Sequence, residues 1–235
     1  MKFKHQIPAG LAMAIIAAAA QADPWQGKGE AGAVWASGNT DSSSINLKLA
    51  MTKVLDEWKH ALDMSYLRAS SNGDTSANKF VGGWQSNYNF STRTFAFGAL
   101  RYEHDEFSGF DYQASASTGL GYKIYDTDTV KFSGQAGVGY RRIKDGVTNE
   151  TSSDAIFVAG LDYEYKVTAT TKLVDKFHLE AGSDNTLLTN FAGVEVKMSD
   201  KLALAAGYDV TQNTKPPAGK KKTDTVTTLN LVYSF

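Results

Sequence analysis

Cysteine is absent from this chain of 235 residues, and proline occurs only 4 times. Without cysteine there is no disulfide framework, and no thiolate can act as a nucleophile or hold a metal. The mean hydropathy of -0.31 argues against membrane-spanning helices. The formal net charge of -1 gives no broad basic surface, so nucleic acid is not an expected partner.

The N-terminal stretch "MKFKHQIPAGLAMAIIAAAAQA" predicts a cleaved signal peptide over residues 1–22. Lys2 and Lys4 precede a short apolar run, and Ala20 and Ala22 form a small-x-small cleavage site. The run is shorter than the roughly 20 residues that a transmembrane helix needs. We therefore expect export through the inner membrane and a mature domain over residues 23–235. Because no cysteine is present, a lipoprotein anchor is excluded.

The rest of the chain alternates apolar and polar residues with a period of two. "SINLKLAMTKVL", "TVKFSGQAGVGYRR" and "DAIFVAGLDYEYKV" are clear examples. This period is typical of strands with one apolar and one polar face. Sustained helical periodicity with caps is not found, so almost no helix is expected.

The breaks between these segments favour hairpins of unequal turn length. Short breaks fall near residues 56–57, 91–93, 126–128, 169–171 and 199–200. Breaks that are mostly longer and more polar alternate with them: "SSNGDTSAN", "HDEFSGFDY", "KDGVTNETSSD" and "NTKPPAGKKKTD", with a compact turn expected at Gly38-Asn39. The predicted fold is all-β, a transmembrane antiparallel up-and-down β-barrel of about 12 strands with both termini periplasmic.

The last segment, "TTLNLVYSF", carries apolar side chains at every second position up to the final residue: Leu229, Leu231, Tyr233 and Phe235. A barrel has no free edge, so the last strand is expected to pair with the first and to turn this face to lipid. The ending also resembles the insertion signal of outer-membrane proteins, which implies that the barrel-assembly machinery reads these four residues. A soluble barrel with an apolar interior is the alternative.

Three stretches are distinctive: "GEAGAVWASGNTDSSSINLKL", "LRYEHDEFSGFDYQASASTGLGYKIY" and the terminal "LNLVYSF". Together they resemble one family, the YdiY-like salt-induced outer-membrane proteins. The resemblance implies an outer-membrane barrel over the whole mature chain. It implies no catalytic residues, because the family carries a name rather than an established activity.

One predicted external loop gathers groups that could do chemistry: His104, Asp105, Glu106 and Asp111. They could form an acid/base site of a barrel hydrolase, protease or lipase in type, or an oxygen-ligand calcium site. A hydrated loop facing lipopolysaccharide and its counterions is the simpler interpretation. The sequence does not identify a Ser–His pair with a third orienting group, and neither a catalytic residue nor a metal or cofactor is expected.

Polar faces aligned through the turns predict a polar, partly wet barrel interior. Small inward side chains are expected at Gly83, Gly98, Ser115, Ser117, Gly119, Gly121, Ser133, Gln135, Gly137 and Gly139. The hypothetical pore-lining set is Lys48, Gln85, Gln135, Asp162, Lys176, His178 and Glu195. Asp162, Lys176 and Glu195 are expected to form a ladder across neighbouring strands, with His178 opposite Gly160 and Gly193.

These expectations favour a monomeric, narrow diffusion channel for small ions or solutes in the outer membrane. Outer-membrane lipid and lipopolysaccharide are the expected surroundings. Two alternatives stay open: a barrel hydrolase with its site around His104, and a plugged structural barrel without conductance.

Overall fold

The computed structural model describes residues 25–36 and 42–235, which form one closed antiparallel barrel of 12 strands. The predicted signal peptide and the turn at Gly38-Asn39 lie outside the described residues. The strands are β1 (Gln26–Ala36), β2 (Ser42–Leu55), β3 (Trp58–Ser71), β4 (Asp74–Asn89), β5 (Thr94–Asp105), β6 (Phe110–Asp126), β7 (Val130–Asp145), β8 (Thr151–Lys166), β9 (Thr171–Gly182), β10 (Thr186–Lys197), β11 (Leu202–Asn213) and β12 (Thr223–Ser234). No helix among the described residues is long and apolar enough to span a membrane.

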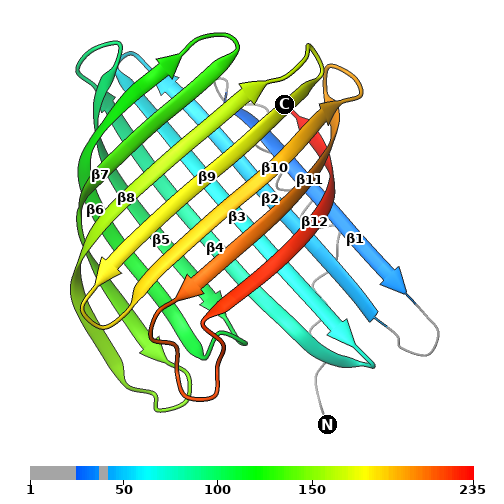
Figure 1. Cartoon of the computed structure of the whole chain (residues 1–235), viewed down its shortest axis with the longest axis vertical. Coiled ribbons are helices and arrows are strands. Elements are labelled where there is room, and N and C mark those ends of the chain that lie inside the picture. Colours follow the sequence, from blue (N-terminus) through cyan, green and yellow to red (C-terminus); the bar gives the residue numbers. More distant parts are fainter. Residues whose placement is uncertain (1–24, 37–41) are drawn as a thin grey trace.

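Each strand pairs with its neighbours in sequence, as predicted for an up-and-down barrel (Figure 1). The five predicted short turns gather at one end of the barrel, together with the C-terminus; we call it the short-turn end. The opposite, long-loop end carries the loop between β11 and β12. One break is shorter than expected, because "SSNGDTSAN" contains a two-residue turn. Asn72 and Gly73 have φ angles of 51° and 86° there, as a tight hairpin turn requires.

The last strand closes the barrel on the first, as the sequence predicts. The amide of Phe235 donates to the carbonyl of Gly27 at 3.0 Å, and the amide of Gly27 donates to the carbonyl of Phe235 at 2.9 Å. Gly27 is required here because a Cβ atom would lie 2.5 Å from the ring of Phe235. On β12, Leu229 is 69% exposed on the outer face, whereas Val232 is fully buried on the inner face.

The outer face of the barrel is apolar over most strands. Large hydrophobic side chains with at least two fifths of their surface exposed include Ile45, Met64, Leu100, Tyr102, Leu120, Tyr122, Val138, Tyr140, Phe157, Leu161, Leu173 and Leu204. A water-soluble monomer rarely exposes so extensive an apolar surface. The pattern is that of a wall that faces lipid, and it disagrees with the soluble-barrel alternative.

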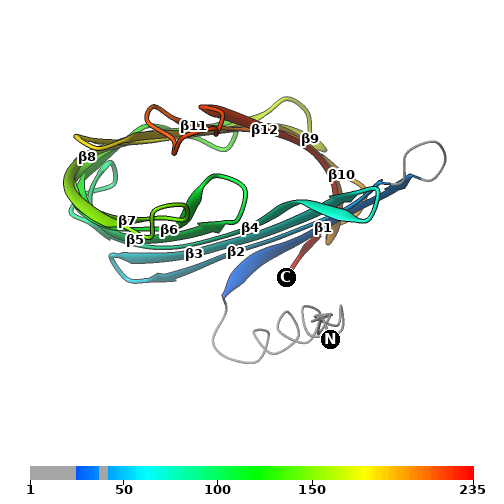
Figure 2. The same ribbon diagram turned by 90° about the horizontal axis from the view of Figure 1, so that it is seen from below.

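The barrel is flattened, and its cross-section is elongated rather than round (Figure 2). Inward glycines let β6 and β7 approach each other closely. A Cβ at Gly119 or Gly137 would come closer than 3.0 Å to the backbone of the partner strand. These two glycines are paired with each other, so β6 and β7 make a crease that larger residues could not form.

Phenylalanine rings fill the space that the β6 glycines leave. Phe95 and Phe97 of β5 pack in one buried cluster with Ile156 and Val158 of β8. A Cβ at Gly121 would collide with the ring of Phe95. The small inward residues were expected to line a wet lumen, and on this side of the barrel that interpretation is wrong. Gly98 also differs from expectation, because it pairs with Ser86 on the outer face.

Candidate functional site: the barrel interior

Charged side chains from every strand point into the barrel. The faces follow from strand alternation and from contacts that cross the interior between non-adjacent strands. Lys28 of β1 donates to Glu195 of β10 at 2.7 Å. Asn46 of β2 donates to Asn230 of β12 at 3.1 Å. The opposite walls therefore meet through polar groups.

A ladder of alternating charges lies on the inner face, but its members differ from those expected. Asp162 is paired with Lys176, and Gly160 with His178, as predicted. The next step is wrong: Lys176 is opposite Phe191, and His178 is opposite Thr189 rather than Gly193. The hairpin between β9 and β10 turns earlier than assumed, because the amide of Gly182 already donates to the carbonyl of Asn185 at 3.2 Å. This displaces the partner by four residues and leaves the inward face unchanged.

The observed ladder runs Glu164, Lys172, Glu195 and Lys28. Lys172 lies 3.4 Å from a carboxylate oxygen of each neighbour, Glu164 and Glu195. Lys28 reaches Glu195 from the other side. Acid and base alternate along the interior wall, which satisfies these charges within the sheet.

The structure places all seven hypothetical pore-lining residues on the inner face. Lys48 forms an ion pair with Asp209 at 3.2 Å, and its Nζ atom lies 4.4 Å from the centre of the Phe191 ring. The amide of Gln85 donates to that of Gln135 at 2.9 Å, joining β4 to β7. Their placement brings strands from opposite walls together, while a role in conduction remains a proposal.

Near the long-loop end, five side chains meet inside the barrel in a group that we call the Arg141 cluster: Arg141, Asp154, Glu180, Ser115 and His178. Arg141 is 1% exposed and Glu180 is 2% exposed. The guanidinium of Arg141 lies 3.7 Å from Asp154 and 3.6 Å from Glu180, and it also donates to the carbonyl of Asn185. Ser115 donates to Glu180 at 2.8 Å, and His178 lies 3.2 Å from the same oxygen.

Several polar atoms in this region have no hydrogen-bond partner among the described residues. They are Nε of Arg141, Oε2 of Glu180 and both amide atoms of Gln113. Gln113 is paired with Glu103 and Ile143 on the same inner face. A buried polar group without a partner is unfavourable by about 1–3 kcal/mol. The interior is therefore polar and closely packed, but some of its buried polar atoms lack hydrogen bonds.

A second buried ion-pair group lies beside the first. Glu103 is held between Lys79 at 2.9 Å and Arg101, while Asp105 lies 3.6 Å from Lys79. Sequence alternation places these residues on one face. Alternation alone does not predict that these side chains meet inside the barrel, because their contacts depend on how far the barrel is flattened.

Two of the proposed hydrolase residues meet: Nδ1 of His104 contacts the backbone carbonyl of Asp111 and lies 3.9 Å from its carboxylate. His104 belongs to strand β5, not to a loop, and points outward, whereas Asp105 points inward. The carboxylate of Asp105 accepts hydrogen bonds from the amides of Phe107 and Ser108, so it stabilises the turn. Asp111 pairs with Lys144 at 2.7 Å. Within residues 25–36 and 42–235, no group of three or more His, Cys, Asp or Glu side chains is arranged to hold a metal.

A Ser–His pair that the sequence did not indicate lies on the outer face. His60 Nδ1 is 2.8 Å from Oγ of Ser86, and the indole of Trp84 donates to the same oxygen at 2.9 Å. Trp58 stacks on His60 with ring centres 6.0 Å apart. No acidic side chain among the described residues hydrogen-bonds or ion-pairs with His60, and Ser86 sits in a paired strand whose amides point along the sheet. The orienting acid and the oxyanion donors of a serine hydrolase are thus not assembled in the described chain.

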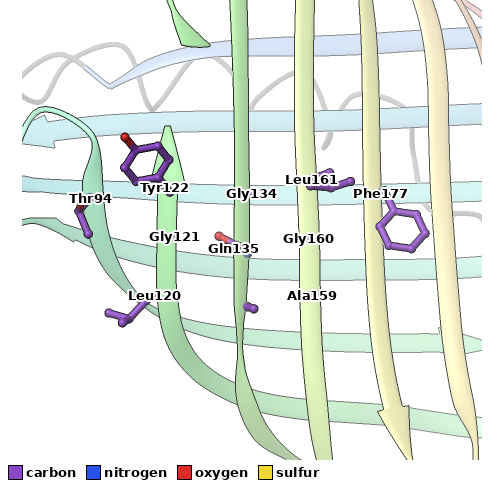
Figure 3. A pocket seen from close by; sticks show the side chains of 11 residues that line it. Thr94, Leu120, Gly121, Tyr122, Gly134, Gln135, Ala159, Gly160, Leu161 and Phe177 are labelled. Atoms are coloured by element: carbon purple, nitrogen blue, oxygen red, sulfur yellow. The ribbon is translucent and has the colours of Figure 1, made fainter. Parts of the chain in front are cut away.

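A shallow depression of about 520 Å³ lies in the wall formed by β5 to β9 (Figure 3). Gly134 is paired with Tyr122 on one side and Leu161 on the other, and its missing side chain leaves this space. Leu120 and Phe177 add apolar rims. Because most of the lining points outward, the depression belongs to the apolar outer face rather than to the interior.

A family model described as "Protein of unknown function, DUF481" matches residues 29–235. The "Uncharacterized protein YdiY" of Escherichia coli (strain K12) is 27% identical over 213 residues, covering 90% of this chain and 84% of that protein. These matches confirm the YdiY-like resemblance.

Two solved outer-membrane barrels share the fold. The NanC porin has a TM-score of 0.53 at 10% identity, over 90% of this chain and 99% of that chain. The COG4313 outer membrane channel from Pseudomonas putida F1 has a TM-score of 0.51 at 13% identity, over 91% and 97%. At such low identity the likeness concerns the fold alone. The family match covers most of the chain, which therefore belongs to the DUF481 family.

Proposed function

We propose that this protein is a narrow outer-membrane channel for small ions or solutes, closed in this structure by side chains of its own wall. In this proposal the signal peptide directs export, and the terminal Leu229, Leu231, Tyr233 and Phe235 are read during barrel assembly. The short-turn end faces the periplasm, and the long-loop end faces lipopolysaccharide. The protein works as a monomer.

The observation that carries the proposal is the charged interior. Buried ion pairs are only weak evidence for a purely structural role, since replacing them with well-packed apolar residues is often neutral or stabilising by about 1–4 kcal/mol. Here the Arg141 cluster and the Glu103 group fill one part of the interior with charge. Ion pairs can exchange for hydrated charges when walls separate, which suits an interior that opens to water.

A plugged structural barrel is the second candidate, and one observation favours it. The buried cluster of Phe95, Phe97, Ile156 and Val158 is dry and joins two strands across the flattened interior. In the proposed channel this cluster stays packed, and the path runs along the charged remainder of the interior.

The proposal assigns no enzyme activity to the barrel. A hydrolase remains the alternative from another class, and its best pair is Ser86 with His60 on the outer face. That pair would need an acid and oxyanion donors, which the described residues around it do not supply.

Conductance of the purified protein in a planar bilayer tests the proposal. The wild type is expected to insert and give small discrete current steps, because the closed interior opens only partly. A folded, inserted protein without current at any voltage would favour the plugged barrel. Hydrolysis of a phospholipid or peptide by the wild type, abolished by Ser86→Ala, would favour the hydrolase.

A further inference from the structure

Unpaired lysines collect inside the barrel near its short-turn end. They are Lys59 of β3, Lys131 of β7 and Lys176 of β9, and all three are exposed to solvent although they lie on the inner face. Lys123, Asp162 and Lys176 lie in one cross-strand row that runs through Ser133 of β7, and Lys131 is one inward step along β7 from Ser133. Lys59, on the facing wall, interacts electrostatically with these charged groups. We call Lys59, Lys123, Lys131 and Lys176 the lysine vestibule.

Other lysines of the interior are neutralised. Lys28, Lys48, Lys79 and Lys172 each have a carboxylate oxygen within 3.4 Å. Within residues 25–36 and 42–235, by contrast, neither Lys59, Lys131 nor Lys176 forms an ion pair with a carboxylate. Uncompensated positive charge is therefore concentrated at one mouth of the barrel.

The negative charge near the vestibule is limited. Asp162 is the cross-strand partner of Lys176. Asp126, at the end of β6, is the cross-strand partner of Lys131 and lies 3.9 Å from Lys123. Glu164 is the cross-strand partner of Lys131 and also pairs with Lys172. The four vestibule lysines thus face three nearby carboxylates, one of which is shared with Lys172. Walls of low dielectric strengthen the remaining positive field on a solute inside the mouth.

We propose that the lysine vestibule binds small polyvalent anions, carboxylate or phosphate in type, at the short-turn mouth. Several lysines on different strands can surround such an anion, and flexible ammonium groups suit anions of varied shape. As a statement about transported solutes, this rests on the channel proposed above. Binding itself does not, because the mouth is open to solvent whether or not the interior conducts.

The test uses the full-length folded protein in non-ionic detergent, with citrate as the trivalent probe and calorimetry at low ionic strength as the readout. The vestibule variant is Lys59→Gln/Lys131→Gln/Lys176→Gln. A matched variant, Lys220→Gln/Lys221→Gln/Lys222→Gln, removes the same charge from the loop between β11 and β12 at the other end. Heat-modifiability on gels verifies folding of both.

The wild type and the loop variant are expected to bind citrate equally, and the vestibule variant at least about tenfold more weakly, since it loses three nearby charges. Equal weakening in both variants would overturn the proposal, because it would indicate a general charge effect. Absence of citrate binding to the wild type would overturn it as well.

Reversal potentials in a potassium chloride gradient separate this inference from the channel itself. A conducting wild type is expected to prefer chloride, and the vestibule variant to lose that preference while the loop variant keeps it. Conduction without anion preference and without citrate binding would contradict the proposed anion site and would still agree with the proposed channel. Citrate binding without any conductance would contradict the proposed channel and would still support the proposed anion site.

Discussion

Replacing Gly137 with valine is expected to abolish assembly of the barrel. Gly137 faces Gly119 across the crease, and a Cβ there would come closer than 3.0 Å to the carbonyl oxygen of Thr118. The obstructing atoms are backbone, so no rotamer change relieves the collision. β6 and β7 would have to separate, and their backbone groups cannot find water inside a bilayer.

The measurement is the fraction of protein that gives a heat-modifiable folded band after refolding into detergent. It is expected to fall to near zero for Gly137→Val. Gly98→Val is the matched control, because no atom lies within 4 Å of a Cβ at that outer-face position. Gly83→Ala tests the inner face, where the nearest atom is at 3.8 Å. If Gly137→Val folded as well as the wild type, the close contact between β6 and β7 at this glycine pair would not be required for assembly.

Removing the Arg141 cluster is expected to raise conductance severalfold. Arg141 and Glu180 are among the largest fully buried side chains of the described chain, and they contact each other between the non-adjacent strands β7 and β9. Arg141→Ser combined with Glu180→Ser deletes both and leaves small polar groups that water can solvate. The interior near the long-loop end then loses two of its largest buried side chains and widens there.

The matched control is Arg142→Ser combined with Glu150→Ser, which removes the same two residue types from exposed positions near the same end. Its conductance should equal that of the wild type. Arg141→Ser alone is expected to destabilise the fold by about 3–5 kcal/mol, because it leaves the carboxylates of Glu180 and Asp154 buried without a cation. Unchanged conductance in the folded double variant would place the Arg141 cluster outside the conducting path.

The sequence predicts the barrel because period-two alternation is local information. Strand number, the five short turns and closure of β12 on β1 all follow from it. Register is predictable only across turns of known length. The tight turn before β9 places Lys176 opposite Asp162, whereas a turn expected near Asn185, two residues too late, misplaces Glu195.

Contacts across the interior are not predictable from alternation. Ser115 meets Glu180 and Arg141 meets Glu180 because the wall creases at β6 and β7 and the barrel flattens. Glycine on an inner face was interpreted as open space. It instead accommodates either a neighbouring strand, as at Gly119, or an aromatic ring, as at Gly121. Whether an inward glycine leaves open space or allows close packing depends on the curvature of the wall. The sequence of a single strand does not determine that curvature.

For solutes to pass, we expect the opposite walls of the flattened barrel to part at their polar contacts, while the apolar cluster of β5 and β8 stays packed. Gln85 and Gln135 form such a contact between β4 and β7. Because the chain contains no cysteine, the variant Gln85→Cys/Gln135→Cys carries the only two thiols. A short bifunctional methanethiosulfonate reagent can bridge them, and a reducing agent releases the bridge.

Single-channel conductance before bridging, after bridging and after reduction is therefore the most direct measurement. The bridged protein is expected to lose most of its current and to recover it on reduction, while each single-cysteine variant treated in the same way keeps its current. Full bridging, verified by mass spectrometry, with undiminished conductance would contradict the claim that these walls must part.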